Sequence, residues 1–314
     1  MSTLWARPEA LTAARGSKLL VLDVDGVLLD ARPSFYEAAR EVASWAAARA
    51  LGHAPGPPVT DEEILAFKNA GGWNDDFDLA CGIAWAQIIR AALGTPIGET
   101  ARNNGGGLAV LLPHAVKILT GEQLEKARES VHTSTVRARC AARYAGAARC
   151  KELYGFDPDL YAGLPQEGLY SLEKPLCDAE LLRSVQMPMG LFTGRNSGEA
   201  GLALERFKLG VPARRRIVDD GVVPKKPSPE GLMLLARETT GPVLFAGDTV
   251  DDKRAAMAYQ QRAAADGLPE LIFAWITPPE ETDADAVAAQ HPEAHIVSVT
   301  LDPLLRVLTT RNPS

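Results

Sequence analysis

One stretch constrains the fold of this chain more than any other: an apolar run that ends in two carboxylates. Residues 18–28 read KLLVLDVDGVL, so Asp23 and Asp25 stand two positions apart, directly before a glycine. A continuous apolar run is typical of a buried parallel strand, and open α/β sheets bind ligands outside the carboxyl ends of such strands. The stretch therefore predicts a strand over residues 19–22 with both acids at a ligand-binding edge.

Two carboxylates this close to each other favour a bound cation. A pair about 4 Å apart costs about 4 kcal/mol at an effective dielectric constant near 20. A divalent cation relieves that repulsion, and Mg²⁺ accepts carboxylates, waters and substrate phosphate oxygens as ligands. We therefore expect Mg²⁺ as the cofactor at this strand end.

A second apolar run, over residues 188–196, ends in Thr193 and Gly194. A hydroxyl and free backbone N–H groups at a turn from strand to helix can donate hydrogen bonds to a phosphoryl oxygen. Threonine at such a turn is also a common N-cap of the helix that follows. The run predicts a second strand end suited to phosphate.

A third stretch, residues 224–230, reads PKKPSPE and places Lys226 directly before Pro-Ser-Pro. The prolines fix the turn, and a lysine there supplies a point charge. Lys225 is the alternative for that role, and a solvated surface turn is the plain alternative for the whole stretch.

The fourth stretch, residues 243–252, is another buried-strand pattern, and it ends in G-D-x-x-x-D. Asp248 and Asp252 are the two acids of that pattern. Asp251 lies between them, and we interpret it as a solvated acid or one at a helix N-terminus.

Taken in order, the four stretches resemble the four motifs of the haloacid dehalogenase superfamily, and in particular its subfamily I phosphatase-like hydrolases. The resemblance implies an α/β fold: a doubly wound, Rossmann-like parallel sheet as the core, with an inserted, mainly α-helical cap of the family's first type. It also implies a Mg²⁺-dependent hydrolase of small phosphate monoesters that works through an aspartyl-phosphate. A small phosphorylated metabolite would be the partner.

The resemblance assigns roles at the first and fourth motifs. Asp23 would be the nucleophile, and Asp25 would protonate the leaving group and later activate water. The Asp23 carboxylate, the Asp25 backbone carbonyl and Asp248 would hold Mg²⁺. Asp252 would act indirectly, either on the metal through a water molecule or by holding Lys226 in place.

The remaining roles concern phosphate and substrate. Thr193, Gly194 and Lys226 would bind the phosphoryl oxygens, and Lys226 would also act beside the nucleophile. Candidate substrate-specificity residues follow the second motif or lie in an unusual loop of the cap: Arg195, Asn196, Trp73, Asn74 and Asp75. For Arg195, contact with substrate and an ion pair with the cap are equally open. For the loop, helix capping and plain packing are the alternatives.

The pattern of elements predicts two domains. Residues 1–30 and 173–314 alternate strand and helix patterns, which indicates the α/β core domain. Residues 31–172 show helix patterns and no clear strand, which indicates an inserted cap domain. The expected strands are residues 19–22, 190–193, 216–218, 243–246, 271–276 and 296–299. The expected helices are residues 33–50, 76–93, 121–153, 178–185, 198–209, 229–238, 251–265 and 302–308.

Several alternatives to a phosphatase remain. The dehalogenase branch lacks an acid at the position of Asp25, so that alternative is weak. A phosphomutase keeps both acids, and a phosphonate-cleaving enzyme needs a cap lysine, for which Lys68 is a conceivable candidate. A catalytically silent metabolite-binding protein is the alternative from another class, although it needs no second acid.

Composition and charge limit the classes of partner that the protein is expected to bind. The net charge of −7 and the pI near 5.4 argue against nucleic acid, which selects basic surfaces. No segment reaches about 18 apolar residues and the first 17 residues have no signal-peptide pattern, so we expect no membrane partner and a cytoplasmic location. The four cysteines show no metal spacing and are expected to be free thiols. The substrate and the oligomeric state stay open.

Overall fold

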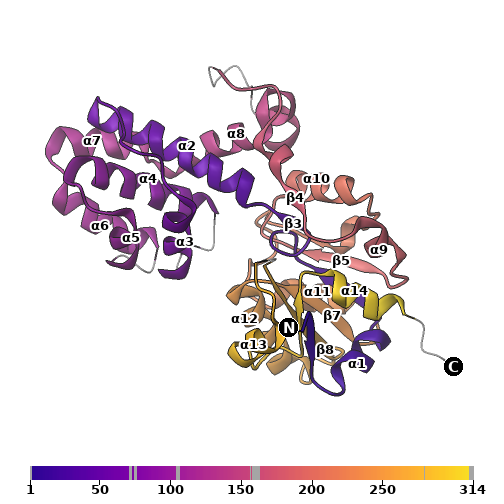
Figure 1. The fold of residues 1–314 in the computed structure, drawn as a ribbon. Helices are drawn as coiled ribbons and strands as arrows, with labels where there is room; N and C mark the ends of the chain where they lie inside the picture. Colours follow the sequence, from indigo (N-terminus) through magenta and orange to yellow (C-terminus); the bar gives the residue numbers. More distant parts are fainter. Residues whose placement is uncertain are drawn as a thin grey trace. The chain divides into compact units, whose positions relative to one another are not determined.

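The computed structural model describes residues 2–70, 73, 76–103, 107–155, 157, 163–278 and 280–310 (Figure 1). Its backbone contacts divide the chain into two compact units. One unit joins Met1–Asp30 to Lys174–Ser314, and the other is the continuous segment Ala31–Glu173. The first unit is an α/β sandwich and the second is helical, so each is described separately.

The α/β unit is built on a seven-stranded sheet in the order β1-β9-β8-β7-β2-β5-β6. The strands are β1 (Leu4–Ala6), β2 (Leu19–Leu22), β5 (Met189–Phe192), β6 (Arg216–Ile217), β7 (Val243–Gly247), β8 (Leu271–Thr277) and β9 (Ile296–Val299). β2 lies at the centre, with parallel neighbours β5 and β7. A separate short pair joins β3 (Leu29–Asp30) to β4 (Lys174–Pro175), where the chain leaves and re-enters the unit.

The sheet is mixed rather than wholly parallel, because β1 pairs antiparallel with β9 at one edge. Strand β1 was not among the expected strands, because its three residues are too few to show a period. The other six strands run parallel, and each overlaps a strand expected from its apolar run. The fold class, a doubly wound sheet with an inserted helical segment, is thus confirmed, with one antiparallel edge strand added.

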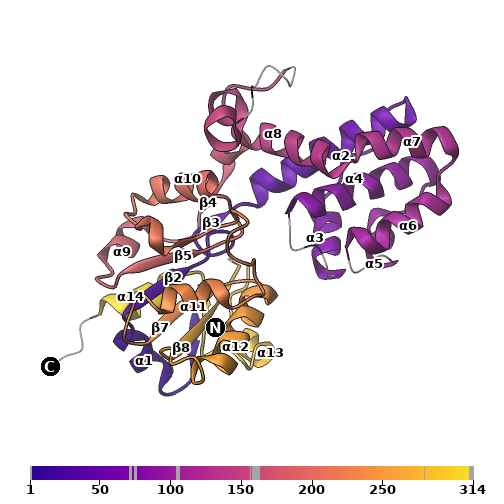
Figure 2. The same ribbon diagram turned by 180° about the vertical axis from the view of Figure 1, so that it is seen from behind.

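Helices cover both faces of this sheet (Figures 1 and 2). Successive side chains of β2 point to opposite faces, and they join two different apolar clusters. One cluster takes in α1 (Ala10–Gly16), α9 (Ala179–Ser184), α10 (Ser197–Phe207) and α14 (Asp302–Thr309). The other takes in α11 (Glu230–Ala236), α12 (Val250–Ala263) and α13 (Ala284–Gln290). Both faces of the central strand are buried, which explains its unbroken apolar sequence.

The described residues of the second unit form helices joined by loops. It contains α2 (Arg32–Leu51), α3 (Asp61–Ala70), α4 (Asp76–Leu93), α5 (Ile97–Asn103), α6 (Leu108–Ile118), α7 (Gly121–Ser130), α8 (Thr133–Tyr154) and the 3₁₀ turn η2 (Leu169–Leu172). Its core is rich in alanine, which lets helices approach closely, as α2 and α4 do. The helix expected over residues 121–153 is interrupted twice: α7 ends at Ser130 before α8 begins at Thr133, and α8 is kinked at Gly146, whose φ of +64° is not helical.

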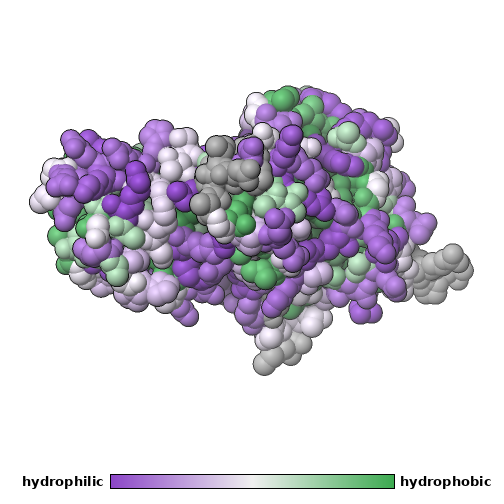
Figure 3. All heavy atoms as spheres, turned by 90° about the horizontal axis from the view of Figure 1, so that it is seen from above, coloured by the Kyte–Doolittle hydropathy of each residue, from purple (hydrophilic) through white to green (hydrophobic). Residues whose placement is uncertain are grey.

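Polar side chains dominate the face of the molecule drawn in Figure 3, with apolar side chains in scattered spots. Val222, at 80% exposure, is the most exposed large apolar side chain among the described residues. The four cysteines are free and buried, as expected. No helix of the described residues combines the length and apolarity needed to cross a membrane.

Candidate active site

Three neighbouring strands bring the motifs to one edge of the sheet. In the register of the central strands, Leu22 of β2 lies beside Leu191 of β5 and Ala246 of β7. Because parallel strands end at the same edge, the residues that follow them are gathered there. Asp23 follows β2, and Asp248 follows β7.

Asp23 is held in a defined position at the end of β2. It is 4% exposed. Its backbone N–H donates to the carbonyl of Ala246 at 3.0 Å, and its Oδ1 accepts from the backbone N–H of Val24 at 2.7 Å. Its Oδ2 lies 2.8 Å from the ammonium of Lys226. The structure thus places the lysine of the third motif against the first acid of the first motif.

Asp252 anchors that lysine from the other side. Its Oδ1 accepts from Lys226 Nζ at 2.7 Å, and its Oδ2 accepts from the N–H and the hydroxyl of Thr249 at 3.0 and 2.6 Å. Thr249 caps α12 in return, since its Oγ1 accepts from the N–H of Asp252. Both carboxylate oxygens of Asp252 therefore have partners, which fits a support for Lys226 better than a metal ligand.

Asp248 has an unpartnered oxygen. Its Oδ1 is buried and has no hydrogen-bond partner among the described residues. Carboxylate oxygens of Asp23, Asp248 and Asp252 lie within 4.8 Å of one another. Buried polar atoms are nearly always paired, so a buried carboxylate oxygen with no donor fits a site for a cation.

Gly26 makes the room that Asp248 occupies. A Cβ on Gly26 would lie 1.9 Å from Asp248 Oδ2, and the residue adopts φ of +73°, where glycine is favoured. The glycine of the first motif therefore has a packing reason that sequence reasoning did not give it. The signal was present, since a glycine directly after D-x-D marks a turn at the strand end.

The electrostatics of the site favour an added positive charge. Three carboxylates surround one ammonium: those of Asp23, Asp248 and Asp252 around Lys226. Burial raises the pKa of Asp23 to about 7, against the opposing effect of Lys226, and burial together with the neighbouring acids raises the pKa of Asp248 well above its usual value. The carboxylates of Asp23 and Asp252 raise the pKa of Lys226, although burial opposes this. Full ionisation of the three carboxyls therefore needs a positive charge in addition to Lys226, and a bound cation can supply it.

Asp25 lies beside this cluster and pairs with Arg195. Arg195 Nη2 donates to Asp25 Oδ1 at 2.6 Å, and its Nε lies 3.1 and 3.2 Å from Oδ1 and Oδ2. The Arg195 side chain is 1% exposed, whereas that of Asp25 is 35% exposed. Sequence reasoning placed Arg195 toward the substrate or the cap and did not foresee this pair, because no local pattern links residues 170 positions apart.

The second motif forms a turn from β5 to α10. The hydroxyl of Thr193 accepts from the N–H of Arg195 at 3.2 Å, and the Thr193 N–H donates to Ile217. Thr193 does not cap the helix, because Asn196 does: its Oδ1 accepts from the N–H of Glu199 in a capping box. The side chain of Asn196, a candidate specificity residue, is thus engaged in holding the turn.

The loop of the helical unit with unusual composition is only partly described. Trp73 is 2% exposed and packs edge-on against Phe67 and over Gly82, where a Cβ would lie 2.4 Å from its ring. Packing in the core of the helical unit thus accounts for Trp73. The other two candidates in this loop, Asn74 and Asp75, lie outside the described residues.

Lys68, the residue considered for a phosphonate-cleaving enzyme, lies on α3. Its ammonium is 3.5 Å from Asp76 and 5.4 Å from the centre of the Tyr36 ring. Lys68 is 40% exposed at its side chain, so solvent competes for its charge.

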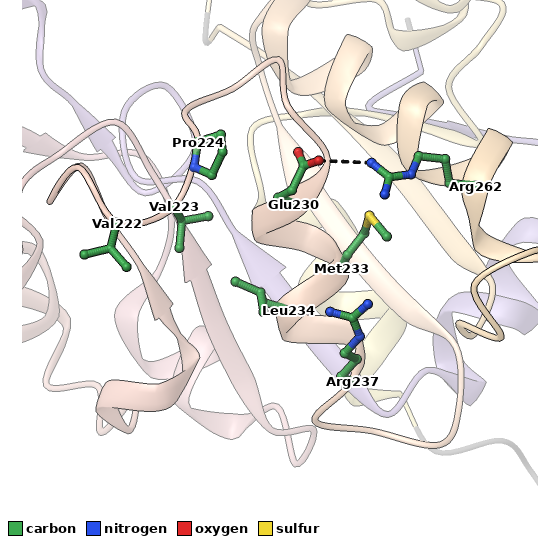
Figure 4. Close-up of a pocket in the computed structure, with 8 residues that line it drawn as sticks. All are labelled: Val222, Val223, Pro224, Glu230, Met233, Leu234, Arg237 and Arg262. Atoms are coloured by element: carbon green, nitrogen blue, oxygen red, sulfur yellow. Dashed lines mark hydrogen bonds and ion pairs between the residues drawn. The ribbon is translucent and has the colours of Figure 1, made fainter.

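A cavity of about 270 Å³ opens beside α11 and the segment that leads to Lys226 (Figure 4). An ion pair between Glu230 and Arg262, 3.0 Å apart, lies on one side of it, and Met233 and Leu234 of α11 point toward it. The carboxylates of the first and fourth motifs, Asp23, Asp25, Asp248 and Asp252, are not among the residues that line this cavity. It is therefore separate from the cluster around Asp23.

Comparison with known proteins identifies the fold. No family model matches the chain, and no curated protein resembles it in sequence. Among solved structures, Phosphatase Tt82 from Thermococcus thioreducens has a TM-score of 0.58 at 21% identity, over 81% of this chain and 92% of that one. A protein solved as a structural-genomics target has a TM-score of 0.55 at 15% identity, over 93% and 98%.

These similarities define the class of fold to which the chain belongs. The sheet order, the inserted helical segment and the matches to these two solved structures confirm the fold class that the sequence predicts, a doubly wound sheet with an inserted helical segment. At these identities the similarity shows the fold alone. Function therefore has to be argued from the site.

Proposed function

We propose that this protein is a Mg²⁺-dependent phosphatase that hydrolyses small phosphate monoesters through an aspartyl-phosphate. The observation that carries the proposal is the arrangement at the end of β2. There the buried carboxylate of Asp23 lies 2.8 Å from Lys226 and close to an unpartnered oxygen of Asp248. The similar structure named a phosphatase supports the same class of enzyme.

Asp23 would act as the nucleophile. Its Oδ1 accepts a backbone hydrogen bond and its Oδ2 faces Lys226, so the carboxylate is fixed before a substrate arrives. Attack of a carboxylate oxygen on phosphorus forms an acyl phosphate and breaks the bond to the leaving oxygen. Water would then hydrolyse the acyl phosphate and return the free carboxylate.

Asp25 would move the protons in both steps. It would give a proton to the leaving alkoxide in the first step and take one from the attacking water in the second, so the enzyme ends as it began. Its side chain is 35% exposed while Asp23 is buried, so it can reach groups outside the cluster. Asp25 is what separates a phosphatase of this kind from the dehalogenase alternative.

Lys226, Thr193 and Gly194 would bind the transferred phosphoryl group. Lys226 carries a charge that Asp252 keeps in position. Thr193 offers a hydroxyl hydrogen, because its oxygen already accepts from the Arg195 N–H. Gly194 has no other atom within 4 Å of its Cβ position, so the backbone there is open to a close approach.

The donor set fits Mg²⁺. The Asp23 carboxylate, the Asp25 carbonyl and Asp248 would be its protein ligands, all of them oxygens, and the unpartnered Oδ1 of Asp248 is the observation that favours a cation there. Bound Mg²⁺ would shield the nucleophile from the anionic phosphate and stabilise the charge of the transition state.

The substrate class follows from the core site, which provides groups for phosphate and metal. Small phosphorylated metabolites such as sugar phosphates, phosphoglycolate, amino-alcohol phosphates or nucleotides all satisfy it. The helical unit would select among them, as an inserted cap does in the superfamily that the motifs resemble.

The direct test is phosphate release from a panel of monoesters with Mg²⁺ or with EDTA. The panel contains glycerol 1-phosphate, glucose 6-phosphate, phosphoglycolate, histidinol phosphate, AMP and p-nitrophenyl phosphate. Release that requires both Mg²⁺ and Asp23, and disappears in a folded Asp23→Asn variant, supports a phosphatase. Full turnover by Asp23→Asn would exclude Asp23 as the nucleophile. No release from any ester would favour a mutase, a phosphonate-cleaving enzyme or a silent binding protein instead.

A further inference from the structure

The ion pair formed by Arg195 and Asp25 is unusual because the arginine side chain is buried and the aspartate side chain is partly exposed to solvent. The Arg195 side chain is 1% exposed and that of Asp25 is 35% exposed. Charged side chains are seldom fully buried, and one that is buried needs partners that offset its lost hydration. The guanidinium of Arg195 is therefore buried, and the carboxylate with which it pairs is partly exposed at the edge of the site.

The backbone of Arg195 is fixed on both sides. Its N–H donates to the hydroxyl of Thr193 at 3.2 Å, and its carbonyl accepts from the N–H of Asp219 at 2.9 Å. The turn that carries Asp25 is fixed as well, since the Gly26 N–H donates to the Leu29 carbonyl at 2.8 Å. Two rigid segments thus meet through one pair of side chains.

The contacts leave one oxygen of Asp25 more open than the other. Among the described residues, Oδ1 accepts from Nη2 at 2.6 Å and from Nε at 3.1 Å, whereas Oδ2 has one contact, to Nε at 3.2 Å. A carboxylate has about four acceptor sites, so Oδ2 keeps the greater free capacity. The guanidinium stays protonated in proteins, so a proton that moves at this pair moves on the carboxylate.

We propose that Arg195 is a positioning residue that orients Asp25 so that Oδ2 carries the proton exchanged with the leaving group and with water. The proposal rests on the phosphatase function proposed above and adds a residue to it. In the first step the Oδ2–H bond breaks and the proton goes to the leaving oxygen. In the second step Oδ2 takes a proton from the attacking water, so atoms and charge balance over the cycle.

The test compares two esters that differ in their need for a proton. p-Nitrophenyl phosphate releases a phenolate that leaves without protonation, whereas the alkyl monoester that wild type hydrolyses best in the panel releases an alkoxide. The value of kcat/KM reports the steps up to the first irreversible one. The ratio of the two kcat/KM values is independent of the fraction of folded enzyme, so a loss of folded protein cannot mimic the effect.

Arg195→Met is expected to lower kcat/KM for the alkyl ester about 100-fold, within the usual range for proton transfer, and to change that for p-nitrophenyl phosphate less than about fivefold. Arg195→Lys, which keeps the charge but loses the two-point contact, is expected to lie between. Arg216→Met is the control, because Arg216 is a partly buried arginine whose Nε donates to the Val211 carbonyl. It is expected to leave the ratio unchanged.

Equal losses for both esters in Arg195→Met would overturn the proposal, because a merely structural role lowers both alike. An unchanged ratio in Arg195→Met together with a changed ratio in Asp25→Asn would also overturn it while leaving the proton role of Asp25 intact. If wild type hydrolysed neither ester, the proposed function would fail, and the positioning role with it. Failure of the proposed function is thus measured in the wild-type protein, whereas failure of the positioning role is measured in the variants, so the two can be distinguished.

Discussion

The ammonium of Lys226 lies 2.8 Å from the Asp23 carboxylate, and the same ammonium lies 2.7 Å from Asp252. One buried charge thus joins the third and fourth motifs to the first, which lies more than 200 residues before them in the sequence. Asp23 directly follows β2, Asp252 lies in the first turn of α12, and Lys226 lies between them in the turn before α11. The proposed nucleophile owes its position to this bridge.

We expect Lys226→Met to destabilise the protein by about 3 kcal/mol and to abolish phosphate release. The lysine side chain is 11% exposed, and removing one partner of a buried ion pair leaves the other uncompensated. Chemical denaturation followed by circular dichroism measures the stability. Lys225→Met is the matched control, because Lys225 pairs with Asp219 at 52% exposure and such pairs contribute little. A larger effect for Lys225 would show that the wrong lysine was chosen.

Removing Asp248 should remove the response to metal. In wild type, Mg²⁺ that binds only the folded state raises the melting temperature, by an amount equivalent to about 2.7 kcal/mol at 100 times Kd. We expect Asp248→Asn to lose this rise, because the unpartnered carboxylate oxygen becomes part of a neutral amide. Differential scanning fluorimetry with a Mg²⁺ titration measures it. Asp251→Asn should keep the rise, since that acid pairs with Arg254. Loss in both variants would argue for general charge effects instead of a defined ligand.

Gly26 should tolerate no side chain. A methyl group on Gly26 would lie 1.9 Å from Asp248 Oδ2, so Gly26→Ala must push Asp248 aside. We expect about 3 kcal/mol of destabilisation and loss of the Mg²⁺ response. Gly221→Ala is the control, because Gly221 has nearly the same φ, +77°, but nothing within 4 Å of the added atom. The backbone cost alone, about 1 kcal/mol, is expected there. Similar losses at the two glycines would mean that the close contact with Asp248 is unimportant.

The sequence predicted the strands of the sheet well where burial on both faces made the apolar run continuous. β2 and β9 have the expected bounds, and β7 extends one residue beyond them. Short elements at the edge of the sheet were not predicted. Strand β1, for example, has three residues and only partly buried side chains. Helices α3, α5 and α6 of the inserted unit were also missed. Their packing, and not a strong local pattern, decides that they form.

At the candidate site, local patterns predicted which acids end strands but not which side chains meet. Lys226 is expected near Asp23 only because the third stretch resembles a superfamily motif whose lysine acts beside the nucleophile. The ion pair between Asp25 and Arg195 depends on the directions of side chains on two neighbouring turns. The spacing of residues in the sequence does not predict these directions. The packing of Trp73 against Gly82 is hidden for the same reason. Contacts between side chains that only the tertiary structure brings together therefore cannot be predicted from these sequence patterns.

The stabilisation by Mg²⁺ should grow as the pH rises from about 4 to about 7. Burial raises the pKa of Asp23 to about 7, above the usual value of 3.8 that it has in the unfolded chain. A carboxyl whose pKa is raised by folding favours the folded state below the unfolded pKa, and this contribution is lost as the pH rises through the folded pKa. The metal-free protein therefore loses stability over this window. Bound Mg²⁺ offsets the loss, because it needs the ionised carboxylate. Melting temperatures measured in EDTA and in Mg²⁺ at a series of pH values give the difference directly. In Asp23→Asn, which has no such proton, the difference should vary less with pH, and an equally steep dependence in that variant would assign the effect to another group.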